Sequence, residues 1–287
     1  MKASVMVIVP HQDDEILMTA GVIRKAVKEQ VPVDVVMATN GDYGCGDQSK
    51  GRTRLRESIR GLEILGLDAD YFHILGYADT GMPAEESFLT HLYESKADDL
   101  QVQTGAENVE NRIYQSACGT ETYGLPEKEE YHMQRHGAHA SYCRRDFKND
   151  LKEIIREKRP ARIYTTSEFD LHGDHSALYK FVCEVLDELA AEEGYIPELY
   201  VSVIHSCAGD DSWPKRGTMV YDCPEGLKEL IWDARIRLAL PEEMCTAIGT
   251  ENLKLQALRQ HKTALEPNAA EYLMTFIKDE EIFWRVR

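Results

Sequence analysis

Three features are missing from the sequence, and each absence narrows the kind of protein that it encodes. Its 287 residues contain no CxxC pair and no N-x-S/T sequon, and no apolar run approaches the roughly twenty residues of a membrane-spanning helix. The missing CxxC pair argues against a structural zinc knuckle. The apolar start of the chain is also too short for a signal peptide.

Positive charge is scarce in this chain. It has 33 Lys and Arg residues against 50 Asp and Glu residues, a formal net charge of -17. Such a surface repels nucleic acid and anionic lipid, so we expect neither as a partner. The seven cysteines are scattered and odd in number. That pattern is typical of reduced thiols, and we therefore expect a cytoplasmic protein.

Apolar runs and helix-like patterns alternate along most of the chain, and 43% of its residues are hydrophobic. This length and composition predict one large α/β domain over residues 1–287, built on a mostly parallel sheet. We expect strands at 5–9, 33–39, 71–75, 161–167, 199–204 and 219–221. We expect helices over 16–27, 51–65, 150–158 and 251–265, after His175, from Glu225, and in a short piece of 269–287.

The alternation stops between residues 83 and 135, where the composition becomes polar and acidic. A structureless stretch of this length is uncommon inside a compact domain. We therefore expect an insertion with helices of its own, or a lid, over about 83–135.

The most unusual stretch follows the first predicted strand, where the apolar run ends at Pro10 and HQDDE follows at residues 11–15. Three acids this close repel one another unless a positive charge gathers them, and a metal ion is the simplest candidate. His11 and Asp14 would supply an imidazole and a carboxylate, while Asp13 would act on a bound water. The alternative is an acidic cap at a helix start, which does not explain the histidine.

A second group of histidine and aspartate side chains follows the predicted strand 161–167. It consists of Asp170, His172, Asp174 and His175. In open α/β sheets, ligands bind at the carboxyl ends of the strands. The two groups would face the same rim if their strands are near each other in the sheet, so we favour a shared site.

Together the two groups offer His11, Asp14 and one further histidine, a set that leaves a coordination position open for water. A cation there lowers the pKa of the water and polarises a substrate carbonyl, with Asp13 as the base. The remaining histidine, if protonated, would stabilise an oxyanion, and Asp174 would hold its proton and orient its ring. These donors suit zinc, and also ferrous iron, cobalt or nickel.

PHQDDE (10–15) and HGDH (172–175) resemble the paired motifs of the PIG-L-like, or LmbE-like, zinc-dependent N-acetylglucosaminyl deacetylases. The family usually has Pro where this chain has Gln12 and Gly173, and neither change removes a functional group. The resemblance implies a Rossmann-like fold with helices on both faces of the sheet. It also implies these roles: zinc held by His11, Asp14 and His175, Asp13 as general base, His172 as the oxyanion-stabilising group, and Asp174 as its partner.

Further segments extend the resemblance through most of the chain. TNGD (39–42) looks like the family's loop after the second strand, and Arg54, Glu57 and the Leu-Gly at 65–66 resemble its second helix. YADTGM (77–82) is similar to the family's Asp-containing loop. These segments imply sugar contacts from Asp79 and Arg54.

We therefore expect a metal-dependent amidohydrolase that removes the N-acetyl group from an N-acetylglucosamine-type sugar or conjugate, with zinc as the cofactor. A metal-dependent phosphoester hydrolase and a catalytically silent sugar-binding protein are the alternatives. A two-metal phosphatase would need more bridging carboxylates than we can assign. A silent binding protein would have no use for Asp13 and His172 beside the ligands. A homo-oligomer is left open.

Overall fold

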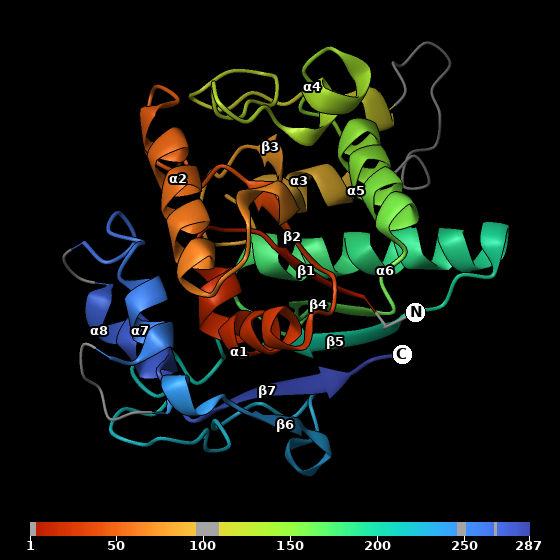
Figure 1. Ribbon diagram of the computed structural model, residues 1–287. Helices are drawn as coiled ribbons and strands as arrows, with labels where there is room; N and C mark the ends of the chain where they lie inside the picture. The colour runs from red at the N-terminus through yellow and green to blue at the C-terminus, as the bar shows by residue number, and fades with distance from the viewer. Residues whose placement is uncertain (1–3, 96–108, 246–250, 267–268) are drawn as a thin grey trace.

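Residues 4–95, 109–245, 251–266 and 269–287 are described by the computed structural model of the chain (Figure 1). The strands are β1 (Val5–Val9), β2 (Val33–Thr39), β3 (Phe72–Tyr77), β4 (Arg162–Thr166), β5 (Glu198–Ser202), β6 (Ile236–Ala239) and β7 (Glu280–Arg285). The α-helices are α1 (Asp14–Glu29), α2 (Ser49–Ile64), α3 (Phe88–Glu94), α4 (Tyr131–His136), α5 (Arg144–Lys158), α6 (Gly173–Glu193), α7 (Leu253–Leu258) and α8 (Ala270–Leu273).

The strands form one sheet in the order β3-β2-β1-β4-β5-β7-β6. Strands β1 to β5 are parallel, and β7 runs antiparallel to both β5 and β6. Strands β2 and β3 extend the sheet on one side of β1. Strand β4 pairs with the other side of β1, and β5, β7 and β6 extend the sheet from there. The β1–β4 pair is therefore the point at which the strand order reverses, the place where ligands bind in such sheets.

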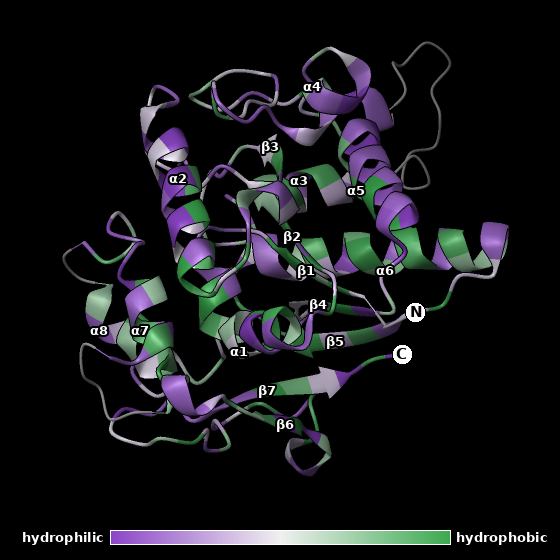
Figure 2. Ribbon diagram, in the orientation of Figure 1, coloured by the Kyte–Doolittle hydropathy of each residue, from purple (hydrophilic) through white to green (hydrophobic). Residues whose placement is uncertain are grey.

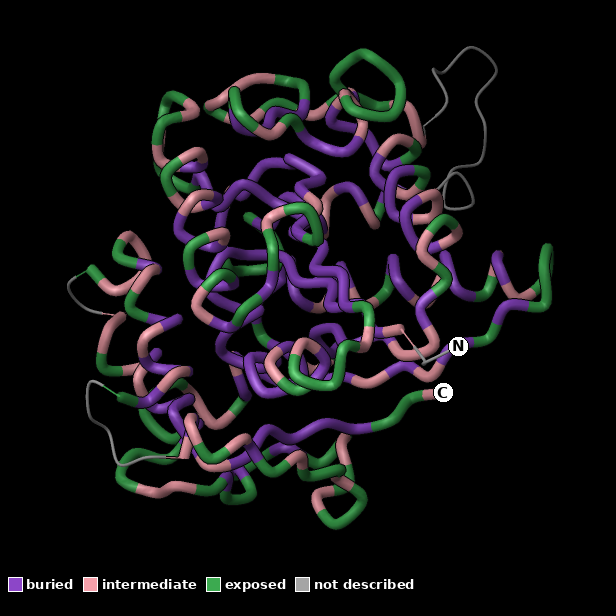
Figure 3. The backbone as a smooth tube through the Cα atoms, viewed as in Figure 1, coloured by how far each residue is buried: buried purple, intermediate pink, exposed green. Residues whose placement is uncertain are grey.

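Helices cover both faces of this sheet, which confirms the predicted α/β architecture (Figure 1). Helices α1, α2 and α7 pack together on one face, while α5 and α6 cover the other and α3 lies against α6. Val5, Val7 and Val9 enter the first apolar core, and Met6 and Ile8 enter the second. Strand β1 is thus buried on both faces (Figure 3), which is why its sequence is an unbroken apolar run.

Hydropathy separates the inner and outer sides of the covering helices. Figure 2 shows hydrophilic and hydrophobic residues mixed along α2 and α5. On α5, Phe147, Leu151 and Ile154 are buried at helical spacing, whereas Lys148 and Lys152 pair with Glu188 of α6. No helix in the described part of the chain is both long and apolar enough to cross a membrane.

The first two predicted strands match β1 and β2 residue for residue, and three others are shifted by a few residues. Predictions for the last third were less successful. Residues 219–221 form no strand, no helix begins at Glu225, and the helix expected over 251–265 is only the short α7. Gly226 has φ 82, which a helix excludes. Beyond α7, the Thr263 N–H donates to the Glu57 carboxylate of α2.

The polar segment 83–135 contains α3 and most of α4, and residues 96–108 of it lie outside the described residues. A polar contact joins it to the main body: His132 Nδ1 of α4 lies 2.6 Å from Asp150 of α5. Asp150 also accepts a hydrogen bond from the Tyr77 hydroxyl of β3 at 3.0 Å. A lid function for this segment stays a prediction.

Helix α1 carries Asp14, and a buried ion pair from the C-terminal part of the chain contacts this helix in its middle. Glu281 of β7 accepts the N–H groups of Gly21 at 2.8 Å and Val22 at 3.2 Å. Lys254 of α7 donates to the Leu17 carbonyl at 2.8 Å and lies 3.2 Å from Glu281. Both side chains are fully buried, so each charge depends on the other.

Lys254→Met tests this dependence. The substitution leaves the Glu281 carboxylate buried without its cation, and we expect the free energy of unfolding to fall by about 3–5 kcal/mol. Urea unfolding measures the loss. The double variant Lys254→Met/Glu281→Gln has no buried charge at this position and should recover part of the stability. A loss below about 1 kcal/mol in the single variant would contradict a structural role for the pair.

Candidate active site

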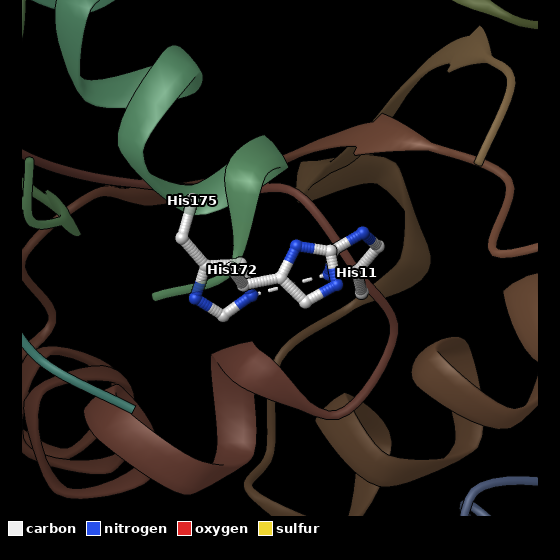
Figure 4. A group of neighbouring side chains, drawn as sticks. All are labelled: His11, His172 and His175. Atoms are coloured by element: carbon white, nitrogen blue, oxygen red, sulfur yellow. Dashed lines mark hydrogen bonds between the residues drawn. The ribbon is translucent and has the colours of Figure 1, made fainter. Parts of the chain in front are cut away.

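The two groups of histidine and aspartate side chains meet at the β1–β4 pair. His11 lies in the turn after β1, His172 ends the turn between β4 and α6, and His175 lies in the first turn of α6. Figure 4 shows the three histidine side chains converging from these segments. The ring centroid of His172 lies 4.4 Å from that of His11 and 4.6 Å from that of His175. The predicted shared rim is confirmed, because β4 is the direct neighbour of β1.

Three donor atoms form a small triangle at this rim. His11 Nδ1 lies 3.2 Å from His175 Nε2 and 3.5 Å from Asp14 Oδ2, and the last two atoms are 3.3 Å apart. All three residues are buried. Two ligands of a tetrahedral zinc ion, each at 2.0–2.1 Å from the metal, lie about 3.3 Å from each other. The triangle therefore has the size that one such ion requires.

A carboxylate lies behind each of the two histidines. Asp174 Oδ2 is 3.0 Å from His11 Nε2, and Asp170 Oδ2 is 3.1 Å from His175 Nδ1. Each carboxylate favours a proton on the nitrogen that it faces, and the other ring nitrogen then presents its lone pair. Two such lone pairs and the Asp14 carboxylate converge in a buried space. A cation is what makes this arrangement of donors favourable.

The pKa values of His11 and Asp14 also indicate that the triangle favours a positive charge. Burial alone lowers the pKa of His11, but the carboxylates of Asp79, Asp14 and Asp174 raise it to about 10. Burial alone raises the pKa of Asp14, but His175 and His11 hold it well below its usual range. A bound divalent cation would supply the positive charge that a proton otherwise brings.

The Asp174 carboxylate faces His11, whereas the sequence led us to expect it on His172. Its Oδ1 accepts hydrogen bonds from the Ser87 hydroxyl at 2.5 Å and the Leu89 N–H at 2.9 Å. Ser87 approaches so closely because residue 173 is glycine: a Cβ there would lie 2.4 Å from the Ser87 Cβ. The segment before α3 thus positions a carboxylate of the candidate metal centre.

His172 is held by the backbone of the same turn. Its Nδ1 accepts a hydrogen bond from the Asp174 N–H at 3.2 Å. Burial lowers the pKa of His172, and the neighbouring His11 and His175 lower it further. These contacts favour a neutral ring with its proton on Nε2, rather than the protonated ring that we expected. A neutral ring of this kind is still a hydrogen-bond donor.

Asp13 has an unusual backbone conformation at the start of α1. Its φ is 119, in a region that residues other than glycine rarely adopt, and such strain is often concentrated at functional sites. Burial and the Asp14 charge raise its pKa to about 7, while Arg54 opposes that shift from 3.9 Å. Asp13 Oδ atoms make no hydrogen bond among the described residues, so this carboxylate is available to a substrate or water.

The two residues expected to contact a sugar lie on either side of this centre. Arg54 donates to the backbone carbonyls of Gln12 at 2.8 Å and Gly41 at 3.1 Å, and it also lines a cavity beside Asp13. Asp79 Oδ2 is 4.0 Å from His11 Nε2, and its N–H donates to Asp42 Oδ1 at 3.0 Å. Arg54 thus fixes two loops at the rim.

Several residues with clear roles in this geometry were not among our predicted site residues. Asp170, which faces His175, was part of the second motif but received no role. Asp42 lies in TNGD (39–42), which the resemblance included but to which it gave no role. Ser87 carries no sequence signal of this kind, because its function depends on contacts with distant residues. Asp42 also accepts the Tyr123 hydroxyl at 2.9 Å.

A second group of metal-type donors consists of His132, His136 and Asp150, between α4 and α5. Here the acids contact the histidines directly: His132 Nδ1 is 2.6 Å from Asp150, and His136 Nε2 is 3.0 Å from Glu153. His136 is also exposed. We interpret this group as two ion pairs that join the helices.

A cavity of about 550 Å³ opens beside the triangle. Asp13, Asp14 and Arg54 line one side of it, and residues between 204 and 273 line the other. The candidate metal centre is thus reached from a space large enough for a small molecule.

The model for the PIG-L family, described as GlcNAc-PI de-N-acetylase, matches residues 6–186. The chain belongs to the PIG-L family. Its match includes both motifs of the candidate site, and it ends within α6, so the cavity wall formed by residues 204–273 lies beyond it.

Individual relatives agree with this assignment. The chain is 31% identical over 108 residues to the probable N-acetyl-alpha-D-glucosaminyl L-malate deacetylase 2 of Bacillus subtilis (strain 168), an alignment of 35% of this chain and 49% of the relative. The chain thus aligns with only about half of that relative's length.

Solved structures share the fold of PIG-L proteins at low identity. The N,N'-diacetylchitobiose deacetylase of Pyrococcus horikoshii matches with a TM-score of 0.55 at 15% identity, over 99% of this chain and 84% of that chain. A 4-carboxy-2-hydroxymuconate hydratase of Pseudomonas putida KT2440 matches with a TM-score of 0.51 at 14% identity, over 100% of this chain and 97% of that chain. The fold therefore hosts more than one reaction, and the activity must be argued from the site.

Asp174→Asn tests the role of the carboxylate behind His11. An amide cannot hold the Nε2 proton as a carboxylate does, and we expect the affinity for zinc to fall about 10- to 100-fold. Competition with a coloured chelator measures this affinity. Asp79→Asn is the matched control, because it removes the same charge near the same nitrogen but from 4.0 Å. Equal losses in both variants would contradict a specific role for the Asp174 contact.

Proposed function

We propose that this protein is a metal-dependent N-deacetylase that hydrolyses the N-acetyl group of an N-acetylglucosamine-type sugar or conjugate. The observation that carries the proposal is the convergence of His11, Asp14 and His175 beside Asp13, whose carboxylate lines the cavity. The names of the relatives support it, since they include deacetylases of an N-acetylglucosaminyl malate and of diacetylchitobiose.

The donor triangle fits a divalent metal, and His11, Asp14 and His175 would hold it. When bound, the metal lowers the pKa of water and polarises the acetamide carbonyl. Asp13 takes the proton from the attacking water. Its carboxylate accepts no hydrogen bond among the described residues, and its contact with Arg54 is an ion pair at 3.9 Å. His172 donates a hydrogen bond from Nε2 to the oxygen on which charge develops. Asp13 then returns the proton to the leaving amine, giving acetate and the free amino sugar.

Zinc is the metal that we propose, because a site of two imidazoles and one carboxylate with an open position is typical of catalytic zinc. The proposed partner is a small N-acetylated amino sugar or its conjugate. We also propose a cytoplasmic location, for which the seven free cysteines of the structure are the support.

Metal removal tests the activity directly. Acetate release from a panel of N-acetylglucosamine derivatives should disappear after treatment with a chelator and return with one equivalent of zinc, since the open coordination position supplies the reactive water. His11→Ala should stay inactive after zinc is restored. Release of phosphate from phosphosugars in place of acetate would contradict the deacetylase proposal, and metal binding without any release would favour a silent binding protein.

Substitutions of Asp13 separate its chemistry from its backbone strain. Asp13→Ala and Asp13→Gly should both lower kcat about 10²- to 10⁴-fold, because each removes the general base. Asp13→Gly should be about 1 kcal/mol more stable than Asp13→Ala, because φ 119 costs glycine little. Acetate release and urea unfolding measure the two effects. If Asp13→Ala kept full activity while His11→Ala lost it, the base would be another residue.

A further inference from the structure

Part of the cavity wall comes from a region of the chain that lies beyond the family match. His205, Asp210 and Tyr272 belong to this wall, and all of them follow residue 186. Asp13 and Asp14 line the same cavity as this wall. A substrate that fills the cavity therefore contacts both.

His205 is fixed from three directions, unlike most side chains of a surface loop. The backbone N–H of His205 donates to Asp170 Oδ2 at 3.1 Å, and Asp170 is the carboxylate that faces His175. Its ring stacks on Tyr272 with centroids 5.4 Å apart and an interplanar angle of 27°. The Tyr272 hydroxyl in turn donates to the Ile204 carbonyl at 2.7 Å. The position of the His205 ring is thus set relative to the candidate metal centre.

The chemistry of the His205 ring follows from its contact with Asp210. His205 Nδ1 lies 3.2 Å from Asp210 Oδ1, and a carboxylate at this distance holds the ring proton on Nδ1. The other nitrogen, Nε2, is then a hydrogen-bond acceptor, and it has no partner among the described residues. With its centroid 5.5 Å from that of His175, the ring is near the metal centre without belonging to the donor triangle.

We infer that His205 is a substrate-binding residue, which accepts a hydrogen bond from a hydroxyl group of the amino sugar while the acetamide lies at the metal centre. This inference rests on the proposed function. The cavity carries both acids and the arginines Arg54 and Arg216, so its charge alone selects no ionic group, whereas a neutral hydroxyl donor matches the free acceptor. The segment beyond residue 186 therefore contributes to the choice of substrate.

His205→Phe is the test, because phenylalanine keeps the ring that stacks on Tyr272 and removes both nitrogens. We expect KM for methyl N-acetylglucosaminide to rise about 3- to 10-fold, the effect of one lost hydrogen bond, with kcat nearly unchanged. Zinc affinity should equal that of the unaltered protein. The matched control is His139→Phe, a partly exposed histidine paired with Glu130 away from the cavity, which should change neither constant.

The 3-, 4- and 6-deoxy forms of the same glycoside identify the hydroxyl. One of them should bind the unaltered protein more weakly and be insensitive to His205→Phe, while the others lose affinity in the variant. Calorimetric binding of the glycosides to zinc-loaded Asp13→Ala protein, with and without His205→Phe, gives this comparison with turnover slowed about 10²- to 10⁴-fold. Absence of acetate release would overturn the proposed function alone. Equal sensitivity of all three deoxy forms to His205→Phe, or loss of zinc in this variant, would overturn the role of His205.

Discussion

The convergence of two imidazole nitrogens and one carboxylate oxygen is the constraint on which the site depends. His11 Nδ1, His175 Nε2 and Asp14 Oδ2 are all acceptors once Asp174 and Asp170 hold the outer ring protons. Buried acceptors facing one another are unfavourable without a cation. The parallel pairing of β1 with β4 brings the two turns together, and the rigid sheet keeps them there. The fold thus stabilises an arrangement that only an added ion completes.

Helix α1 links this centre to the C-terminal part of the chain. It begins at Asp14, and in its middle it bonds to Glu281 and Lys254. The family match ends at residue 186, but the body of the fold continues, because β5 adds to β4 and β7 adds to β5. Contacts from beyond the family match therefore also help to hold the helix that carries Asp14.

Much of the first half could be predicted from the sequence for a physical reason. Strands buried on both faces are unbroken apolar runs, so β1 and β2 were located residue for residue, and Pro10 marked where the first one ends. Both polar motifs stood out because each follows such a run. The sequence did not predict elements whose formation depends on tertiary contacts. Strand β6 is an edge strand of four residues, and the helix expected over 251–265 ends early, where the Thr263 N–H donates to Glu57.

The same limit applies to the contacts among the side chains of the candidate site. Which carboxylate faces which histidine depends on the angle at which two turns meet, and spacing along the chain does not encode that angle. Asp174 was therefore placed on His172, whereas in the structure it contacts His11. Ser87 could not have been found, because it is 87 residues away from Asp174 in the chain and belongs to the polar segment.

The close approach of Gly173 to Ser87 has a consequence for how this protein can change. Any side chain at 173 would displace the segment before α3, and Ser87 would then release the carboxylate that orients His11. The start of α6 and the segment before α3 are therefore matched to each other. Replacing the start of α6 alone by that of a relative with proline at position 173 would also remove the N–H that donates to the Met82 carbonyl. A change at residue 173 thus requires a compensating change around Ser87, although the two lie far apart in the chain.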